Sequence, residues 1–152
     1  MNTANQSSIL TEVIRSFQDA FNATDLSQVV QAYAPDGVLL PNNGPAAQGQ
    51  PAIEAVYRAL FNSFAITITY TIEQHAIEGD LAWVRTSSQV VTRVQASGEL
   101  IALENKDLFV LRRQQGAWKI AHYIFNNTAK HEATKLNNYP YAIRHHRLVR
   151  PY

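Results

Sequence analysis

The spacing of apolar side chains changes from a helical period to a strand period near residue 65. In the first part they lie on one face of a helix, because they recur at every fourth position: Ile9, Val13, Phe17 and Phe21. In the second part they alternate with threonine, as in a strand with one buried face: Ile66, Ile68, Tyr70 and Ile72. Helices followed by a separate run of strands predict an α+β domain with an antiparallel sheet.

The first part predicts three helices and one short strand. The helices cover residues 8–23, 25–33 and 51–64, and the strand covers residues 38–40. Asp25 opens the second helix, because Asp25 and Gln28 have the spacing of a capping box. Pro51 suits the first turn of the third helix, where its missing N–H is not needed.

The second part predicts a four-strand meander. Its strands cover residues 65–77, 81–95, 100–113 and 117–125. Short turns rich in Gly, Asp, Ser and Gln separate them. Because no internal repeat or low-complexity tract interrupts this pattern, we expect one domain.

Composition narrows the class of protein further. Apolar residues make up 46% of the 152 residues, which is ample for one packed core. The chain has no cysteine, which excludes disulfides, thiolate metal sites and cysteine nucleophiles. The first eight residues are polar, and no apolar run approaches the ~18 residues of a membrane span. We therefore expect a cytoplasmic protein that does not bind membranes.

The charges are distributed unevenly along the chain. Residues 129–152 hold five basic and one acidic side chain, a net charge of +4, whereas the whole chain carries +1. We divide the chain into a domain of residues 1–128 and a basic C-terminal extension of residues 129–152. This pattern does not favour nucleic-acid binding. The extension either docks on the acidic body or on a partner's, or remains solvated.

Five segments occur in an order and spacing that resemble the nuclear transport factor 2-like superfamily. They are FNATDL (21–26), YAPDGV (33–38), GQPAI (49–53), GDLA (79–82) and LFVLRRQQGAWKI (108–120). The chain is most similar to the SnoaL-like branch of that superfamily, of the SgcJ/EcaC type. This resemblance implies a cone, in which a strongly curved sheet wraps three helices and leaves a pocket at its open end. It also implies a homodimer formed through the outer face of the sheet.

The resemblance does not extend to the catalytic residues of ketosteroid isomerase, the best understood relative. That enzyme uses an Asp base, a Tyr and a protonated Asp. The position of its tyrosine, five residues before Asn22, is Phe17 here, and the position of its base is Leu40. Neither side chain can donate or accept a proton. The third group falls near Asp107 or Leu108. Isomerisation by that mechanism is therefore not expected.

Asp107 and His122 are the candidate catalytic residues. They lie on the last two predicted strands, and a four-residue loop would place them directly opposite each other. An Asp that orients a His is a common way to build a general base near neutral pH. A three-residue loop with a bulge would instead place Asp107 opposite Tyr123. An edge salt bridge or a solvent-facing pair is the structural alternative to the dyad.

The candidate pocket is mostly apolar. Its residues come from the helices and from the strands that face them: Phe17, Phe21, Tyr33, Leu40, Tyr57, Phe61, Asn105 and Asn126. Such a pocket would bind a small apolar or aromatic molecule. We find no motif for a cofactor, and the histidines have no metal-ligand spacing. Trp83 and Arg85 share one strand face, which lines the pocket wall or, as we favour, packs against a dimer partner.

Two functions follow from these features. The first is a small-molecule pocket with cofactor-independent acid–base chemistry of the isomerase, cyclase or dehydratase type. The alternative is a non-catalytic dimeric module for ligand binding or association. The two hypotheses differ in whether a titratable group lies at the pocket.

Overall fold

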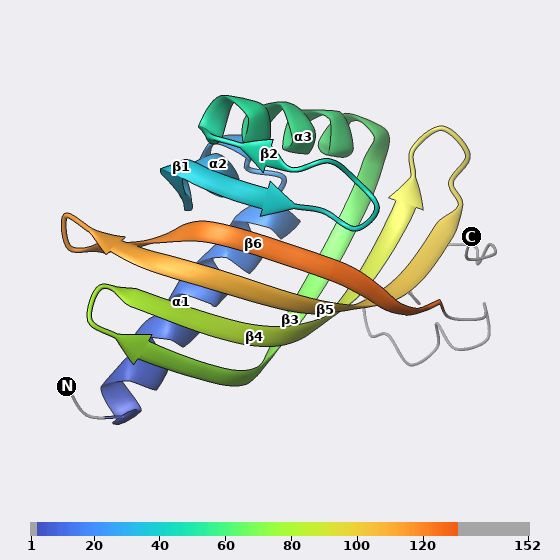
Figure 1. The fold of residues 1–152 in the computed structure, drawn as a ribbon. Coiled ribbons are helices and arrows are strands. Elements are labelled where there is room, and N and C mark those ends of the chain that lie inside the picture. Colours follow the sequence, from blue (N-terminus) through green and yellow to red (C-terminus); the bar gives the residue numbers. More distant parts are fainter. Residues whose placement is uncertain (1–2, 131–152) are drawn as a thin grey trace.

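Within the described residues, three helices precede four long strands, as the change of period predicts (Figure 1). Two shorter strands, where one was predicted, lie between the second and third helices. The structure is a computed structural model that describes residues 3–130. The helices are α1 (Thr3–Asn22), α2 (Leu26–Gln31) and α3 (Gln50–Ser63). The strands are β1 (Tyr33–Leu40), β2 (Ala47–Gln48), β3 (Phe64–Glu78), β4 (Leu81–Val94), β5 (Leu100–Gln114) and β6 (Ala117–Lys130). None of these helices is long and apolar enough to cross a membrane. From residue 131 on, the predicted basic extension lies outside the described residues.

The starts of the second and third helices follow the local signals. The side chain of Asp25 caps α2 by accepting a hydrogen bond from the N–H of Gln28 at 3.1 Å. Pro51 lies in the first turn of α3, where its ring matches the helical φ. The start of α1 at Thr3 is earlier than the predicted start at residue 8.

The six strands form one sheet in the order β2-β1-β6-β5-β4-β3. The four strands β3 to β6 are the predicted antiparallel meander. Strand β1 lies beside β6 and runs parallel to it. Strand β1 begins earlier than the strand predicted for residues 38–40, and the short β2 was not predicted. The reason is tertiary pairing, because Tyr33 at the start of β1 pairs with Ile120 of β6, and the two residues of β2 pair with Val38 and Leu39 of β1.

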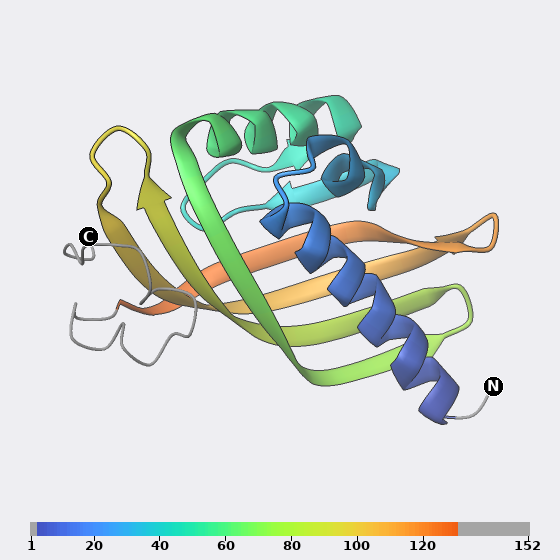
Figure 2. The same cartoon turned by 180° about the vertical axis from the view of Figure 1, so that it is seen from behind.

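Helix α1 crosses the concave face of the sheet, while α3 lies over the end formed by β1 and β2 (Figure 2). Side chains of α1 also pair with the open edge of β3. The side-chain amide of Asn22 accepts a hydrogen bond from the N–H of Ile68 at 2.8 Å and donates one to its C=O at 2.9 Å. The side chain of Gln18 accepts a hydrogen bond from the N–H of Tyr70 at 2.8 Å. These bonds satisfy backbone groups that an edge strand otherwise leaves unpaired.

Two members of the apolar stripe predicted for α1, Phe17 and Phe21, are buried in the core, whereas Ile9 and Val13 are half-buried. Phe17 is 2% exposed. The ring of Phe17 makes edge contacts with Tyr33, Phe109 and Tyr123 at centroid distances of 5.8 to 6.0 Å. Edge-to-face packing of this kind adds to the free energy gained from burial alone.

The hairpin between β5 and β6 has a turn of two residues. Gln115 and Gly116 have φ angles of 52° and 79°, and Gln114 pairs with Ala117. Positive φ at both turn residues is typical of a type I′ hairpin, whose twist matches that of the strands. Both predicted loops, of four and of three residues, are therefore wrong.

A bulge in β6 then changes which side chains face the helices. Leu111 pairs with Ile120 but Val110 pairs with His122, so Ala121 is the extra residue. Without it, His122 would lie on the same face as Ile120. With it, Tyr123 faces the helices and His122 faces outward. The Cα partner of Asp107 is Phe125.

Candidate functional site

A cavity of about 310 Å³ lies between α1, α3 and the concave face of the sheet. Its walls are mostly aliphatic and aromatic, and no charged side chain lines it. The lining residues are Phe17, Phe21, Leu39, Pro41, Asn42, Val56, Tyr57, Leu60, Ile66, Ile68, Tyr70, Val90, Leu103, Asn105, Tyr123, Phe125 and Asn127. Two wider hollows, of about 500 and 550 Å³, are lined mainly by polar side chains near the surface.

Asp107 lies behind the wall of this cavity and is 2% exposed. Its carboxylate accepts three hydrogen bonds from hydroxyl groups. Thr86 and Ser88 donate at 3.0 and 3.2 Å, and Tyr123 donates at 3.1 Å. Strand alternation explains the cluster, because Thr86 and Ser88 share the inner face of β4 and Thr86 is the Cα partner of Asp107.

Burial raises the pKa of Asp107 to about 6. The three hydroxyl donors act in the opposite direction, because they stabilise the ionised carboxylate, but their effect is smaller. The carboxyl group therefore changes charge near neutral pH, unlike an ordinary surface Asp.

Tyr123 and Tyr70 connect this carboxyl to the cavity. Their hydroxyl oxygens are 2.7 Å apart, and both side chains line the cavity whereas Asp107 does not. Phe109 holds the ring of Tyr123 by stacking at 4.1 Å. Burial raises the pKa of both tyrosines well above the usual value, so both stay protonated. The result is a chain of hydrogen bonds from Asp107 through Tyr123 to Tyr70.

A second tyrosine pair lies on the side of α3. The hydroxyl oxygens of Tyr33 and Tyr57 are 2.6 Å apart. Tyr57 lines the cavity, and Tyr33 lies behind it without any exposed surface. Burial raises the pKa of both hydroxyls. The pair therefore supplies neutral hydrogen-bonding groups, as a buried tyrosine generally does.

Three asparagines supply the remaining polar side chains of the cavity wall. The backbone N–H of Asn127 donates to Asn42 Oδ1 at 3.2 Å. The side chain of Asn105 is different, because its Oδ1 is buried and has no hydrogen-bond partner among the described residues. An unpaired buried carbonyl oxygen is costly, so it marks a place where a partner is missing.

The cavity contains four of the eight predicted pocket residues. Phe17, Phe21, Tyr57 and Asn105 line it. Phe61 packs against Phe21 at 5.3 Å without lining the cavity. Tyr33 lies behind Tyr57, as described above.

For two predicted pocket residues, Leu40 and Asn126, the predicted direction of the side chain is wrong. Leu39 and Asn127 line the cavity in place of Leu40 and Asn126. Asn126 is exposed on the outer face. In each case the residue that lines the cavity is the direct neighbour of the predicted one. Adjacent side chains of a strand point to opposite faces of the sheet.

The predicted dyad of Asp107 and His122 is wrong. Asp107 faces the helices, whereas His122 is exposed on the opposite face of the sheet. Asp107 instead contacts Tyr123, the partner expected for the three-residue loop, although it does so diagonally across the ladder. Tyr70, Thr86 and Ser88 were not predicted as site residues. Tyr70 belongs to the alternating run of β3, and that alternation was the signal for its inward direction.

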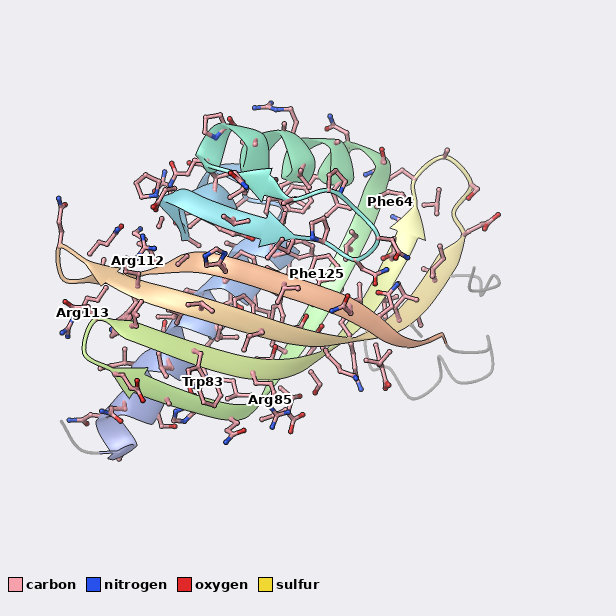
Figure 3. The ribbon with its side chains drawn as sticks, viewed as in Figure 1. Phe64, Trp83, Arg85, Arg112, Arg113 and Phe125 are labelled. Carbon is pink, nitrogen blue, oxygen red and sulfur yellow. The ribbon has the colours of Figure 1, made fainter. Side chains whose placement is uncertain are left out.

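Trp83 and Arg85 lie on the outer face of β4, turned away from α1 (Figure 3). They therefore do not line the cavity. No group of three or more His, Asp or Glu side chains that could hold a metal ion occurs among residues 3–130.

Comparison with known proteins identifies a matching domain family and several structures with a similar fold. A family model described as SnoaL-like domain matches residues 14–123. A ketosteroid isomerase-like protein from Erwinia carotovora atroseptica has a similar structure, with a TM-score of 0.76 and 27% identity over 80% of this chain and 95% of that chain. A conserved protein from Planctomyces limnophilus matches with a TM-score of 0.76 and 17% identity over 82% and 98% of the two chains.

A third structure has a similar fold. It is a putative calcium/calmodulin dependent protein kinase II association domain from Xanthomonas campestris, with a TM-score of 0.67 and 18% identity over 84% of this chain and 89% of that chain. At this identity the likeness concerns the fold alone. No protein of curated function matches the sequence.

Proposed function

The chain belongs to the SnoaL-like domain family, and we propose that it binds a small, mostly apolar molecule in the cavity between α1, α3 and the sheet. One observation carries this proposal: a cavity of about 310 Å³ with largely aliphatic and aromatic walls and few polar groups. Small-molecule sites typically have this character, with an apolar lining that supplies affinity and a few polar groups that orient the ligand.

The aromatic walls favour a flat or ring-shaped ligand. Phe17, Phe21, Tyr57 and Tyr123 present ring faces and edges from three different elements. Aromatic ligands gain from offset or edge-to-face contacts with such rings in addition to apolar burial.

Blocking the cavity tests this proposal. Val56 lines the cavity from α3 and is 36% exposed, so a larger side chain fits there without disturbing the core. Titration with naphthalene, followed by NMR of the backbone amides, should shift resonances of cavity residues. We expect Val56→Trp to weaken that binding about tenfold or more, because the indole occupies the space of the ligand.

The matched control is Arg58→Trp, since Arg58 is exposed on the same helix and does not line the cavity. This variant should bind naphthalene like the wild type. Binding that survives Val56→Trp unchanged, or shifts confined to surface residues, would contradict the proposal.

A second candidate function is proton transfer without a cofactor, and the chain from Asp107 to Tyr70 favours it. A base with a pKa of about 6 is well matched to a reaction near neutral pH. When the oxygen of Tyr70 accepts a proton from a ligand, Tyr70 passes its own proton to Tyr123, and Tyr123 passes its proton to Asp107. The Erwinia relative is described as ketosteroid isomerase-like, but Phe17 and Leu40 mean that its namesake's tyrosine and base have no counterpart here.

Hydrogen exchange at an activated C–H tests this second candidate without the natural substrate. The α-hydrogens of 2-tetralone exchange with heavy water, and NMR follows their loss. The wild type should accelerate this exchange and Asp107→Asn should not, while naphthalene binding persists in both. Equal exchange rates with the two proteins would contradict proton transfer by Asp107, and ligand binding would remain as the proposed function.

We also propose that two copies of the chain associate through the outer face of the sheet. Leu108 and Ile124 face each other as Cα partners, and each is 37% exposed. Trp83 and Val110, which pair with each other on the adjoining strands, extend this surface. We call these four residues the outer patch. Apolar side chains grouped on an exposed sheet face are typical of an interface between subunits.

A further inference from the structure

We propose that the basic C-terminal segment, residues 131–152, docks on the outer face of its own sheet, at the hairpin end of β4 and β5. The inference does not depend on the cavity, because it concerns the opposite face of the sheet. Three features support it: a buried apolar cluster on that face, the point at which β6 ends, and the composition of the segment. The segment itself lies outside the described residues.

A small apolar cluster is buried on the outer face of the sheet. It consists of Val91 from β4 and of Leu100 and Ala102 from β5, which are 9%, 1% and 1% exposed. These side chains point away from the helices, because Val90 and Leu103, their direct neighbours in the two strands, belong to the main core. Both faces of the sheet are therefore buried at this end.

Leu108 provides an internal comparison for Leu100. The two leucines share the outer face of β5, since they are eight residues apart, yet Leu108 is 37% exposed and Leu100 is 1% exposed. Leu108 has a paired strand on each side, whereas Leu100 pairs with β4 alone. The strands shield Leu100 less, so an additional layer must cover it. No helix among residues 3–130 lies on that face (Figure 1, Figure 2).

The end of β6 brings the next residues of the chain to this cluster. Lys130, the last residue of β6, pairs with Leu103, which adjoins Ala102. Residues 131–152 follow, and a few of them in extended conformation, at about 3.3 Å each, are enough to span the cluster. A segment that starts beside its binding surface loses little entropy when it docks there, because the loop that it closes is short.

The composition of the segment suits this surface. It holds four basic side chains and one acidic side chain, whereas residues 1–130 hold nine basic and eleven acidic ones, so the two parts attract each other. The outer patch proposed for the dimer starts about 20 Å further along β5, and docking leaves it free. Large apolar side chains of the segment are available to cover the cluster: Leu136, Tyr139, Tyr141, Ile143, Leu148, Val149 and Tyr152.

A spin label beside the cluster tests the inference. The chain has no cysteine, so Gln89→Cys, at an exposed position of β4 two residues before Val91, takes a nitroxide label selectively. NMR of the ¹⁵N-labelled chain compares the amide signals of residues 131–152 with the label oxidised and reduced. We expect the oxidised label to remove a run of these signals. Gln115→Cys, in the exposed turn at the other end of β5, is the matched control and should leave them intact. Signals that also survive in Gln89→Cys would overturn the inference.

A charge in the cluster tests whether the cluster itself is the docking surface. Ala102→Asp, added to the labelled Gln89→Cys chain, should restore the lost signals, because a carboxylate buried without a partner is unfavourable. Signals that stay lost although this variant folds would overturn the inference. If the variant does not fold, the comparison of Gln89→Cys with Gln115→Cys decides alone.

A mixed sample identifies the copy on which the segment docks. Spin-labelled Gln89→Cys chains without ¹⁵N are mixed with ¹⁵N-labelled chains that carry no spin label. We expect the signals of residues 131–152 to survive in this sample. Loss of the same signals would mean that the segment docks on a second copy of the chain, which would overturn docking on its own sheet.

Discussion

Asp107 and Tyr123 share a 3.1 Å hydrogen bond although neither is the other's partner in the strand ladder. The Cα partner of Asp107 is Phe125, and that of Tyr123 is Phe109. The bond therefore runs diagonally between β5 and β6, which side chains of this length can span. It connects a buried carboxyl to a hydroxyl that faces the cavity.

Burial of Asp107 should make stability depend on pH in a defined direction. The pKa rises from 3.8 to about 6 on folding, so the folded chain holds the proton more tightly than the unfolded chain. The resulting stabilisation is complete below pH 3.8 and is lost as the pH rises through 6. From this group alone, the free energy of unfolding should fall by about 3 kcal/mol over that range.

Asp107→Asn removes this titration, so the decrease in stability between pH 4 and pH 7 should be smaller in the variant. Urea unfolding at a series of pH values measures the slope for both proteins. Because the slopes are compared, a uniform effect of the substitution on stability does not matter. Parallel curves for the wild type and the variant would show that Asp107 has an ordinary pKa.

Tyr123→Phe should raise the pKa of Asp107 further above 6. The hydroxyl of Tyr123 stabilises the ionised carboxylate and thus lowers that pKa. Titration of the ¹³C-labelled carboxyl by NMR reads the change directly. Tyr70→Phe is the control, because it removes a hydroxyl that does not bond to Asp107, and its effect should be smaller. A lower pKa in Tyr123→Phe would contradict the assigned hydrogen bond.

Asn22→Ala should destabilise the chain by about 2–3 kcal/mol, because it leaves two backbone groups of Ile68 on the edge strand without partners. Urea unfolding gives the change in midpoint. Asn62→Ala, an exposed site near the end of α3, should shift the midpoint little. Similar midpoints for the two variants would mean that α1 does not hold the edge of β3.

Ile124→Asp should separate the proposed dimer into monomers, because it places a charge in the outer patch, where the partner would bury it without a counter-ion. Sedimentation velocity over a range of concentrations measures the state of association. Gln115→Asp changes an exposed turn residue away from the outer patch and should leave the dimer intact. A wild type that sediments as a monomer at every concentration would refute this mode of association.

Local features of the chain were sufficient to predict most of the architecture. The change of period near residue 65 predicts the order of helices and strands, and the Asp25 cap and Pro51 mark two helix starts that the structure has. These signals act between residues a few positions apart, so they can be read without knowing the rest of the fold. The same reasoning identified Phe17, Phe21, Tyr57 and Asn105 as inward-facing.

The details of the site depended on contacts between distant segments. The partner of Asp107 follows from a two-residue turn and from one extra residue at Ala121. A single inserted residue reverses the direction of every later side chain in a strand, and its position is set by how both strands pack against the helices. For that reason the sequence identifies Asp107 as a candidate site residue, but only the tertiary structure buries it and places Tyr123, and not His122, beside it.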